Sequence, residues 1–154
     1  MATQTEVGSH RGNADTAIEV VTAMAAGDLP RLLEIWSPKL RVHSPRSAGP
    51  LISGSAWPDT PDPFREHDEY VTVFKAAIGR IYAEVEPPEF LQVAADGDVV
   101  IPLVIIRARL HDGTPYANLY CFPMRFEDGK VVEMWEVHDS GYAFPLFKKQ
   151  LSLG

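Results

Sequence analysis

Three Asp-Gly pairs divide the second half of the sequence at equal intervals. They stand at positions 96–97, 112–113 and 128–129, each between runs rich in Val, Ile, Tyr and Phe. Asp-Gly favours the two-residue turn of a β-hairpin, because both residues tolerate a positive φ. The pattern therefore predicts four antiparallel strands, near residues 89–95, 98–110, 114–126 and 130–138. The middle strands would be about twice the usual length, and strands that long must twist and curl.

The first half of the sequence has helical periodicity instead. Apolar side chains recur every three or four residues within Thr16–Ala26, which predicts an amphipathic helix over this segment. Gly27 fits the left-handed position that ends such a helix, and Asp28 fits the N-cap of a short second helix over Leu29–Trp36. An apolar stripe over 70–82 predicts a third helix.

A segment with many prolines separates the second helix from the third. A short strand is expected over Lys39–His43, stopped by Pro45. The stretch Ser44–Glu66 then contains five prolines and two glycines. A loop this long in a small domain is typical of a lid or the rim of a binding site. A surface excursion with a short strand around Leu51–Ser53 explains the composition equally well.

Composition limits the class of protein. With 154 residues, 45% of them hydrophobic and 23% charged, the chain has the material for one globular domain with a core. The net charge of −7 disfavours nucleic acid and anionic membranes as partners. No apolar run reaches transmembrane length, and the lone Cys121 cannot form an internal disulfide, which favours a cytoplasmic location. The domain is expected to span residues 13–147, between a flexible tail at 1–12 and a second tail at 148–154.

Three helices followed by a curled antiparallel sheet predict an α+β fold. Three motifs accompany this order: Ala-Gly-Asp at 26–28, Val-His-Ser-Pro at 42–45 and Phe-Glu-Asp-Gly-Lys-Val-Val-Glu-Met-Trp-Glu-Val-His-Asp at 126–139. With them the chain resembles, from Ala14 to Phe144, the superfamily of cone-shaped α+β barrels that includes ketosteroid isomerase, the SnoaL-like polyketide cyclases and nuclear transport factor two. The resemblance implies a sheet wrapped around three N-terminal helices, and a homodimer formed through the outer face of the sheet.

This superfamily includes isomerases, hydrolases, cyclases and proteins that only bind, so the fold does not fix the function. The last motif is similar to the closing strand of the SnoaL-like proteins and of the phenazine-biosynthesis A/B proteins. Aligned with ketosteroid isomerase, the general-base Asp falls on Ser44, and the two oxyanion-hole donors fall near Val20 and Phe122. None of these residues carries the required group, so steroid isomerisation by that mechanism is not expected.

Side chains alternate between the two faces of a strand, so parity separates the candidates for chemistry. The resemblance directs one face of the last strand into the cone: Val132, Met134, Glu136 and His138. Glu136 is the main catalytic candidate, because a carboxylate among apolar neighbours loses hydration, and its pKa then rises toward a value that suits a general acid or base. The alternative is a solvated carboxylate, or an ion-pair partner of Arg107.

Two residues near the end of this strand are further catalytic candidates. His138 lies about 7 Å along the strand from Glu136, on the same face. It would assist Glu136 or hydrogen-bond a substrate, unless it is merely hydrogen-bonded at the rim. Asp139 matches the acidic end of the SnoaL-like motif, where a carboxylate serves as the acid or base. Its parity points it away from Glu136 unless the strand bends.

Residues expected to bind the substrate lie on neighbouring strands. Asn118, Tyr116 and Tyr120 share a face and carry donors that would polarise a carbonyl or stabilise an enolate, although tyrosine is also a common structural residue of strands. His43 and Ser44 adjoin the long loop, and one of them should face the mouth of the cavity. The other expected lining residues are Arg107, Met134 and Phe122.

These features favour a small enzyme that needs no cofactor or metal. The five histidines lack metal-site spacing, and no glycine-rich nucleotide loop or Gly-x-Ser-x-Gly motif is present. The substrate would be a small hydrophobic molecule, cyclic and with a carbonyl. The reaction would be an isomerisation, a cyclisation or a lyase-type step by general acid–base catalysis. The alternative is a module of the same fold that binds a small molecule or a protein partner without catalysis.

Overall fold

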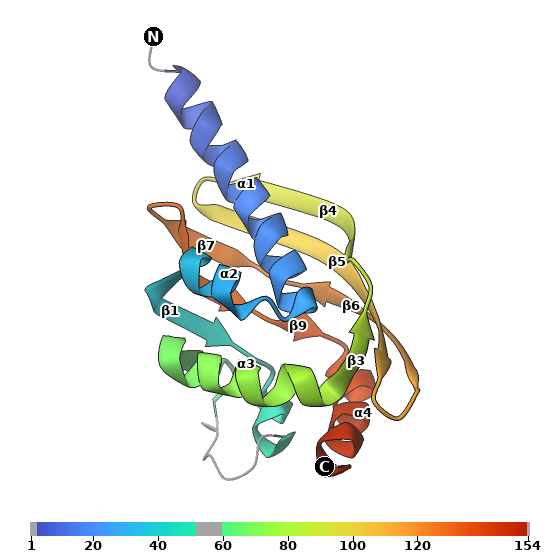
Figure 1. Ribbon diagram of the computed structural model, residues 1–154. Helices are drawn as coiled ribbons and strands as arrows, with labels where there is room; N and C mark the ends of the chain where they lie inside the picture. The colour runs from blue at the N-terminus through green and yellow to red at the C-terminus, as the bar shows by residue number, and fades with distance from the viewer. Residues whose placement is uncertain (1–2, 52–59, 154) are drawn as a thin grey trace.

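Four α-helices and one nine-stranded sheet make up the part of the chain that the computed structural model describes, residues 3–51 and 60–153 (Figure 1). The helices are α1 (Thr3–Ala26), α2 (Leu29–Ile35), α3 (His67–Ile81) and α4 (Ser140–Ser152), with a short 3₁₀ helix, η1 (Arg46–Leu51). The strands are β1 (Trp36–His43), β2 (Phe64–Glu66), β3 (Tyr82–Val85), β4 (Glu89–Asp96), β5 (Val99–Leu110), β6 (Pro115–Cys121), β7 (Met124–Glu127), β8 (Lys130–Trp135) and β9 (Val137–His138).

The predicted α+β architecture is confirmed, with one change in the sheet. Its strand order is β2-β1-β8-β7-β5-β6-β9, and β3 and β4 both pair with β5. The sheet curls without closing around the side covered by α1, α2 and α3, and α4 packs against α3 and η1 at one end (Figure 1). The expectation of an antiparallel sheet is wrong at one junction, because β1 pairs with β8 in parallel. Strand β8, from the end of the sheet-forming half, thus lies beside the first strand, β1, and this pairing joins the two halves of the fold.

A hairpin forms at each of the three Asp-Gly pairs, as predicted, but only Asp128-Gly129 is the expected two-residue turn with both φ angles positive. Gly97, Gly113 and Gly129 all have positive φ angles, of 60°, 87° and 74°, as does Asp128 at 51°. The turns join β4 to β5, β5 to β6 and β7 to β8. Local turn chemistry therefore sets the hairpin order of this half of the chain.

The two strands predicted near 114–126 and 130–138 are each broken once, but the register continues across both breaks. Leu103 pairs with Cys121 on β6, and Val99 pairs with Arg125 on β7, in one continuous antiparallel register. The first break lies at Pro123, which has no N–H to donate to the ladder. Only its carbonyl takes part, accepting from the N–H of Trp135 at 2.9 Å.

The ends of the chain are more helical than expected. Helix α1 begins at Thr3 rather than near Thr16, so the segment expected as an N-terminal tail is helical from that residue. Helix α4 extends to Ser152, across most of the segment expected as a C-terminal tail. Strand β3 was not predicted. Of the strand expected around Leu51–Ser53, Leu51 belongs to η1, and positions 52 and 53 lie outside the described residues.

The core fills the space between the helices and the inner face of the sheet. Trp36 is 1% exposed and makes edge-on contacts with Tyr70 and Phe74 of α3, at 5.4 and 5.9 Å between ring centroids. Val20 and Val21 of α1 are equally buried. This packing anchors α1 and α3 to the sheet. No described helix is long and apolar enough to cross a membrane.

The outer face of the sheet carries exposed apolar side chains on three strands. Leu119 of β6 is 49% exposed, Val137 of β9 is 53% exposed and Ile101 of β5 is 40% exposed. The register places Ile105 opposite Leu119 and Val137 opposite Cys121, so these side chains share one face. Such a face suits the homodimer that the resemblance implies.

We expect the double substitution of Leu119→Lys and Val137→Lys to make the protein monomeric at micromolar concentration, because two charges would be buried without partners in the dimer. Sedimentation velocity would measure the change against the wild-type protein, which we expect to be a dimer. Leu33→Lys, at an exposed leucine of α2, is the matched control and should remain dimeric. A monomeric wild-type protein would refute the dimer.

Candidate functional site

A cavity of about 180 Å³ lies between the helices and the inner face of the sheet. Most of its lining is apolar or aromatic, contributed by α1, α3, α4 and the sheet. Its polar lining residues are few: Ser44, Arg65, Tyr70, Tyr82, Tyr120, Glu136 and His138. An apolar cavity with a few converging polar groups is the usual form of a small-molecule site.

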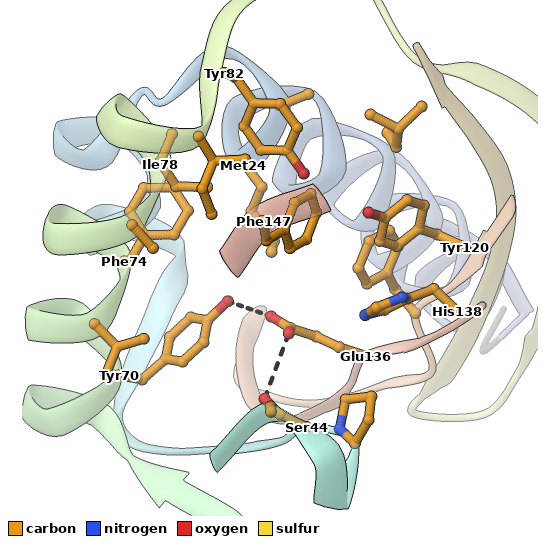
Figure 2. Close-up of a pocket in the computed structure, with 18 of the residues that line it drawn as sticks. Met24, Ser44, Tyr70, Phe74, Ile78, Tyr82, Tyr120, Glu136, His138 and Phe147 are labelled. Carbon is orange, nitrogen blue, oxygen red and sulfur yellow. Dashed lines mark hydrogen bonds between the residues drawn. The ribbon is translucent and has the colours of Figure 1, made fainter. Parts of the chain in front are cut away.

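Glu136 is the carboxylate of this cavity, as predicted. The hydroxyl of Tyr70 donates to its Oε1, and Ser44 Oγ donates to its Oε2 at 3.4 Å (Figure 2). Burial raises the pKa of Glu136, while the hydrogen bonds from Tyr70 and Ser44 and the charge of Arg65 act in the opposite direction. The carboxyl group therefore gains a proton more readily than an exposed glutamate.

The backbone around Glu136 explains its placement. Glu136 lies between β8 and β9, at the break in the last strand, and its N–H donates to the carbonyl of His43 at 2.8 Å. The expected parity holds for Met134, Glu136 and His138. The expected parity fails at Val132, because the pairing register of β7 and β8 shifts there. Val131 therefore belongs to the core cluster in place of Val132.

Tyr70 and Arg65 are site residues that the sequence did not reveal. Tyr70 belongs to the apolar stripe of α3, which gave no reason to separate it from its core neighbours. Arg65 is 2% exposed, lies on β2 after the proline-rich segment, and places Nε 3.4 Å from a carboxylate oxygen of Glu69. Burial lowers the pKa of Arg65, opposed by the charges of Glu69 and Glu136. Arginine still stays charged in proteins, so it places a positive charge beside Glu136.

His138 lines the same cavity, two residues after Glu136. Its ring lies between those of Tyr120 and Phe144, at centroid distances of 4.9 and 5.2 Å. Burial lowers the pKa of His138, opposed by the backbone and the charge of Asp139. Its buried Nδ1 has no hydrogen-bond partner in the described part of the chain. A neutral imidazole with a free nitrogen can hydrogen-bond a ligand.

Tyrosine hydroxyls form a second polar region of the cavity. Those of Tyr82 and Tyr120 point into the cavity on the side across from Glu136 (Figure 2). The Tyr120 hydroxyl lies 2.5 Å from that of Tyr116. Burial raises the pKa of Tyr120 well above its usual value, so its phenol keeps its proton at neutral pH.

Asp139 does not reach the cavity. It is exposed, and its side chain caps α4 by accepting the N–H of Tyr142 at 3.1 Å. The expectation that Asp139 acts as an acid or base in the pocket is therefore wrong, because its side chain caps α4 and does not line the cavity. An Asp placed just before a helix has a structural use that explains it.

Arg107 faces outward, contrary to expectation. It forms an ion pair with Glu89 at 2.5 Å, while Val104 and Ile106 on the alternate face are buried. Residues 99–106 are apolar on both faces, so this strand lacks a clear alternation. The two arginines at 107 and 109 mark the outer face, because charged side chains are costly to bury.

Of the pair beside the long loop, Ser44 lines the cavity and His43 does not. His43 lies on the opposite face of the sheet, where its ring stacks on Trp135 at 4.4 Å. Its Nε2 lies 2.7 Å from Glu133, and its Nδ1 lies 2.9 Å from Asp62. The described residues contain no group of three or more His, Cys, Asp or Glu side chains that can hold a metal ion.

The other expected binding residues divide into two groups. Phe122 and Tyr120 line the cavity. Asn118, Tyr116 and Met134 are buried and do not line it. Met134 is part of the core cluster, and Asn118 and Tyr116 lie behind Tyr120 in a hydrogen-bonded network.

Comparison with known proteins identifies the family and supports the fold. The family model of the SnoaL-like domain matches residues 17–134. The chain belongs to the SnoaL-like domain family. A search of curated proteins gives no match.

Solved structures share the fold of this SnoaL-like chain at low sequence identity. An NTF2-like protein of unknown function from Burkholderia pseudomallei has a TM-score of 0.72 and 20% identity, covering 88% of this chain and 97% of that one. IdmH from Streptomyces antibioticus, whose suggested activity is that of a polyketide cyclase, has a TM-score of 0.70 and 22% identity, covering 87% and 96%. AclR from Streptomyces galilaeus, a suggested hydroxylase, has a TM-score of 0.69 and 19% identity, covering 91% and 83%. These similarities show the fold.

We expect Tyr70→Phe to raise the pKa of Glu136 further, because the carboxylate loses a hydrogen bond that favours its ionised form. Carbon-13 NMR of the glutamate carboxyl groups would follow the titration, with the Glu136 signal assigned from Glu136→Gln. Loss of this part-buried hydrogen bond should also cost about 1 kcal/mol of stability. Tyr142→Phe, outside the cavity, is the control. An unchanged titration in Tyr70→Phe would contradict the assigned contact.

We expect Asp139→Ala to lower the free energy of unfolding by about 1 kcal/mol and Asp139→Asn to change it little, because asparagine also caps helices well. Urea denaturation followed by circular dichroism would measure both. If Asp139→Asn were as costly as Asp139→Ala, the capping role would be wrong.

Proposed function

We propose that this SnoaL-like domain is an enzyme that needs no cofactor and moves a proton on a small hydrophobic carbonyl compound held in the cavity. Glu136 acts as the general base and then as the general acid. The observation that carries the proposal is the position of this half-buried carboxylate, which lines an apolar cavity and has donors on both oxygens. Catalytic carboxylates gain their basicity in such settings.

The proposed step begins with removal of a proton from a carbon next to the carbonyl. The proton goes to the Glu136 carboxylate, the C–H electron pair forms a C=C bond, and the carbonyl π electrons move to the oxygen. If a neighbouring C=C bond extends the enolate, Glu136 returns the proton to the far carbon of the dienolate and the double bond moves, which is an isomerisation. If instead the enolate carbon attacks a second carbonyl, a C–C bond forms and Glu136 gives its proton to the resulting alkoxide, which is an aldol-type cyclisation. Both outcomes need the same base and the same oxyanion donor.

The hydroxyl of Tyr120 is the proposed donor to that oxygen. It keeps its proton at neutral pH and points into the cavity on the side across from Glu136. His138 adds a nitrogen between the two, with its pKa lowered toward the neutral form by burial. A fixed donor in a site of low polarity stabilises a developing oxyanion more strongly than water does.

The chemistry of the lining supports a flat hydrophobic substrate. Phe122, Phe144 and Phe147 line the cavity. Aromatic walls favour rings that stack or pack edge-on against them. The substrate class we propose is therefore a cyclic or polycyclic molecule with a carbonyl oxygen.

A binding module without catalysis is the second candidate. It is favoured by the contacts of Glu136 itself, because both carboxylate oxygens already accept hydrogen bonds. In that case the carboxylate would orient Tyr70 and Ser44, and the cavity would hold a ligand without changing it.

Deuterium exchange of 2-tetralone in D₂O separates the two functions without knowledge of the natural substrate. We expect the wild-type protein to accelerate exchange at the carbons beside the carbonyl, followed by proton NMR. Glu136→Gln should lower the rate by about 10²–10⁴-fold, the usual contribution of a positioned base. The wild-type rate should rise with pH as Glu136 ionises, at a pH above that of an exposed glutamate.

Glu89→Gln is the control, because Glu89 is paired with Arg107 on the outer face. Circular dichroism and thermal unfolding should show that both variants are folded. Full exchange by Glu136→Gln would refute the role of this residue. Binding of 2-tetralone without any exchange by the wild-type protein would favour the binding module.

A further inference from the structure

Asn118 lies behind the cavity with its side-chain amide fixed in one orientation. Its Oδ1 accepts the N–H of Leu119 at 2.9 Å, and its Nδ2 donates to the carbonyl of Asp139 at 3.1 Å. A backbone N–H only donates and a backbone carbonyl only accepts, so exchanging the two ends of the amide would break both bonds. The second hydrogen of Nδ2 therefore points at the hydroxyl oxygen of Tyr116, 3.1 Å away.

This orientation settles the role of Tyr116. Its oxygen accepts from Asn118, which offers it no acceptor in return. Tyr116 is 2% exposed and does not line the cavity, so its own hydrogen must go to a neighbouring hydroxyl. The neighbouring hydroxyls are that of Tyr120, at 2.5 Å, and that of Tyr82. The hydrogen bonds thus run outward, from Asn118 through Tyr116 to the hydroxyls that line the cavity, and Tyr120 makes the 2.5 Å contact.

We propose that Asn118 and Tyr116 are positioning residues that orient the Tyr120 O–H into the cavity as a donor for a ligand oxygen carrying full or developing negative charge. Outward donation leaves the Tyr120 hydrogen on the cavity side, where the Tyr82 hydroxyl and a ligand oxygen are its acceptors, whereas a reversed chain would use it on Tyr116. Consecutive hydrogen bonds also polarise one another, which strengthens the last donor. The inference rests on the proposed function for its role in catalysis, but its binding chemistry stands by itself.

Neighbouring residues hold this series of hydrogen-bonded side chains rigidly. The ring of Tyr142 stacks on that of Tyr116 at 5.4 Å, with an angle of 17° between the planes. Asp139, whose carbonyl holds the Asn118 amide, also caps α4. The same helix supplies Phe144 and Phe147 to the cavity wall. The position of the Tyr120 donor is therefore coupled, through Asp139 and α4, to the position of Phe144 and Phe147 in the cavity wall.

Tyr82 carries the other hydroxyl beside this series of hydrogen-bonded side chains. It lines the cavity, and its hydroxyl lies near those of Tyr116 and Tyr120. A ligand oxygen at this end of the cavity therefore meets two phenols, of which Tyr120 makes the 2.5 Å contact with Tyr116. The ligand class that fits is an enolate, a phenolate or a strongly polarised carbonyl.

The test uses 4-nitrophenol as the probe and Glu136→Gln as the background, so that no proton can pass to Glu136. The ratio of phenolate to phenol in the bound probe is read from absorbance near 400 nm across a pH series. Tyr116→Phe should lower this ratio about tenfold, the size of one weakened charge-assisted hydrogen bond. Tyr120→Phe should lower it at least as much. Tyr142→Phe removes a hydroxyl from the same aromatic stack and should change the ratio less than twofold.

A double-variant comparison tests the order of the chain. If Asn118 acts through Tyr116, then Asn118→Leu should lower the ratio, and adding it to Tyr116→Phe should cause no further loss. Tyr116→Phe keeps the ring contacts, and its folding is checked by circular dichroism. Should Asn118→Leu fail to fold, the pair Tyr116→Phe and Tyr120→Phe gives the same comparison for the outer link.

Three results would overturn the inference: an unchanged ratio in Tyr116→Phe, an equal loss of affinity for phenol and phenolate, or no saturable phenolate binding when Asn118, Tyr116 and Tyr120 are all present. The experiment needs no turnover. Its failure is therefore distinct from failure of the 2-tetralone exchange, which tests Glu136.

Discussion

The carboxylate of Glu136 lies in a cavity whose walls are mostly apolar, and much of the surrounding structure compensates for its lost hydration. Three segments bring partners to it. Ser44 follows β1, Tyr70 lies on α3, and Arg65 on β2 adds a positive charge. Each partner lowers the pKa of Glu136, while burial raises it. Because burial is the larger effect, the carboxyl group stays a stronger base than an exposed one, which is the property a proton-transfer site requires.

Side-chain contacts on the opposite face of the sheet fix the strands that carry these partners. His43 is paired with Phe64 of β2 and with Trp135 of β8 in the sheet register. Its ring stacks on Trp135, and its nitrogens contact Asp62 and Glu133. The same residue accepts the N–H of Glu136 through its carbonyl. Contacts on the rear of the sheet thus fix the spacing of β2, β1 and β8, and with it the spacing of Arg65, Ser44 and Glu136 at the front.

The parts of this arrangement that depend on local sequence were predictable. Asp-Gly turns and strand alternation set the hairpins, and the position of Glu136 followed from the family resemblance and from parity. Tyr70 and Arg65 were not predictable, because their contacts with Glu136 span 66 and 71 positions of sequence and no local pattern marks them. Helix α4 was missed because Pro145 and Gly141 lie inside it. The orientation of Arg107 was missed because both faces of that strand are apolar before it, so its two arginines were the better guide.

The opposed shifts of Glu136 and His138 bear on the proposed chemistry. Burial raises the pKa of the carboxyl and lowers that of the imidazole, so both groups move toward their uncharged forms. In the proposed reaction, a proton taken by Glu136 leaves a negative charge on the substrate, and the net charge of the cavity does not change. The free-energy cost is then that of moving a negative charge within a medium of low polarity, from Glu136 toward the substrate oxygen near Tyr120. Donors fixed in advance at both ends lower that cost, because they do not have to reorient as the charge moves.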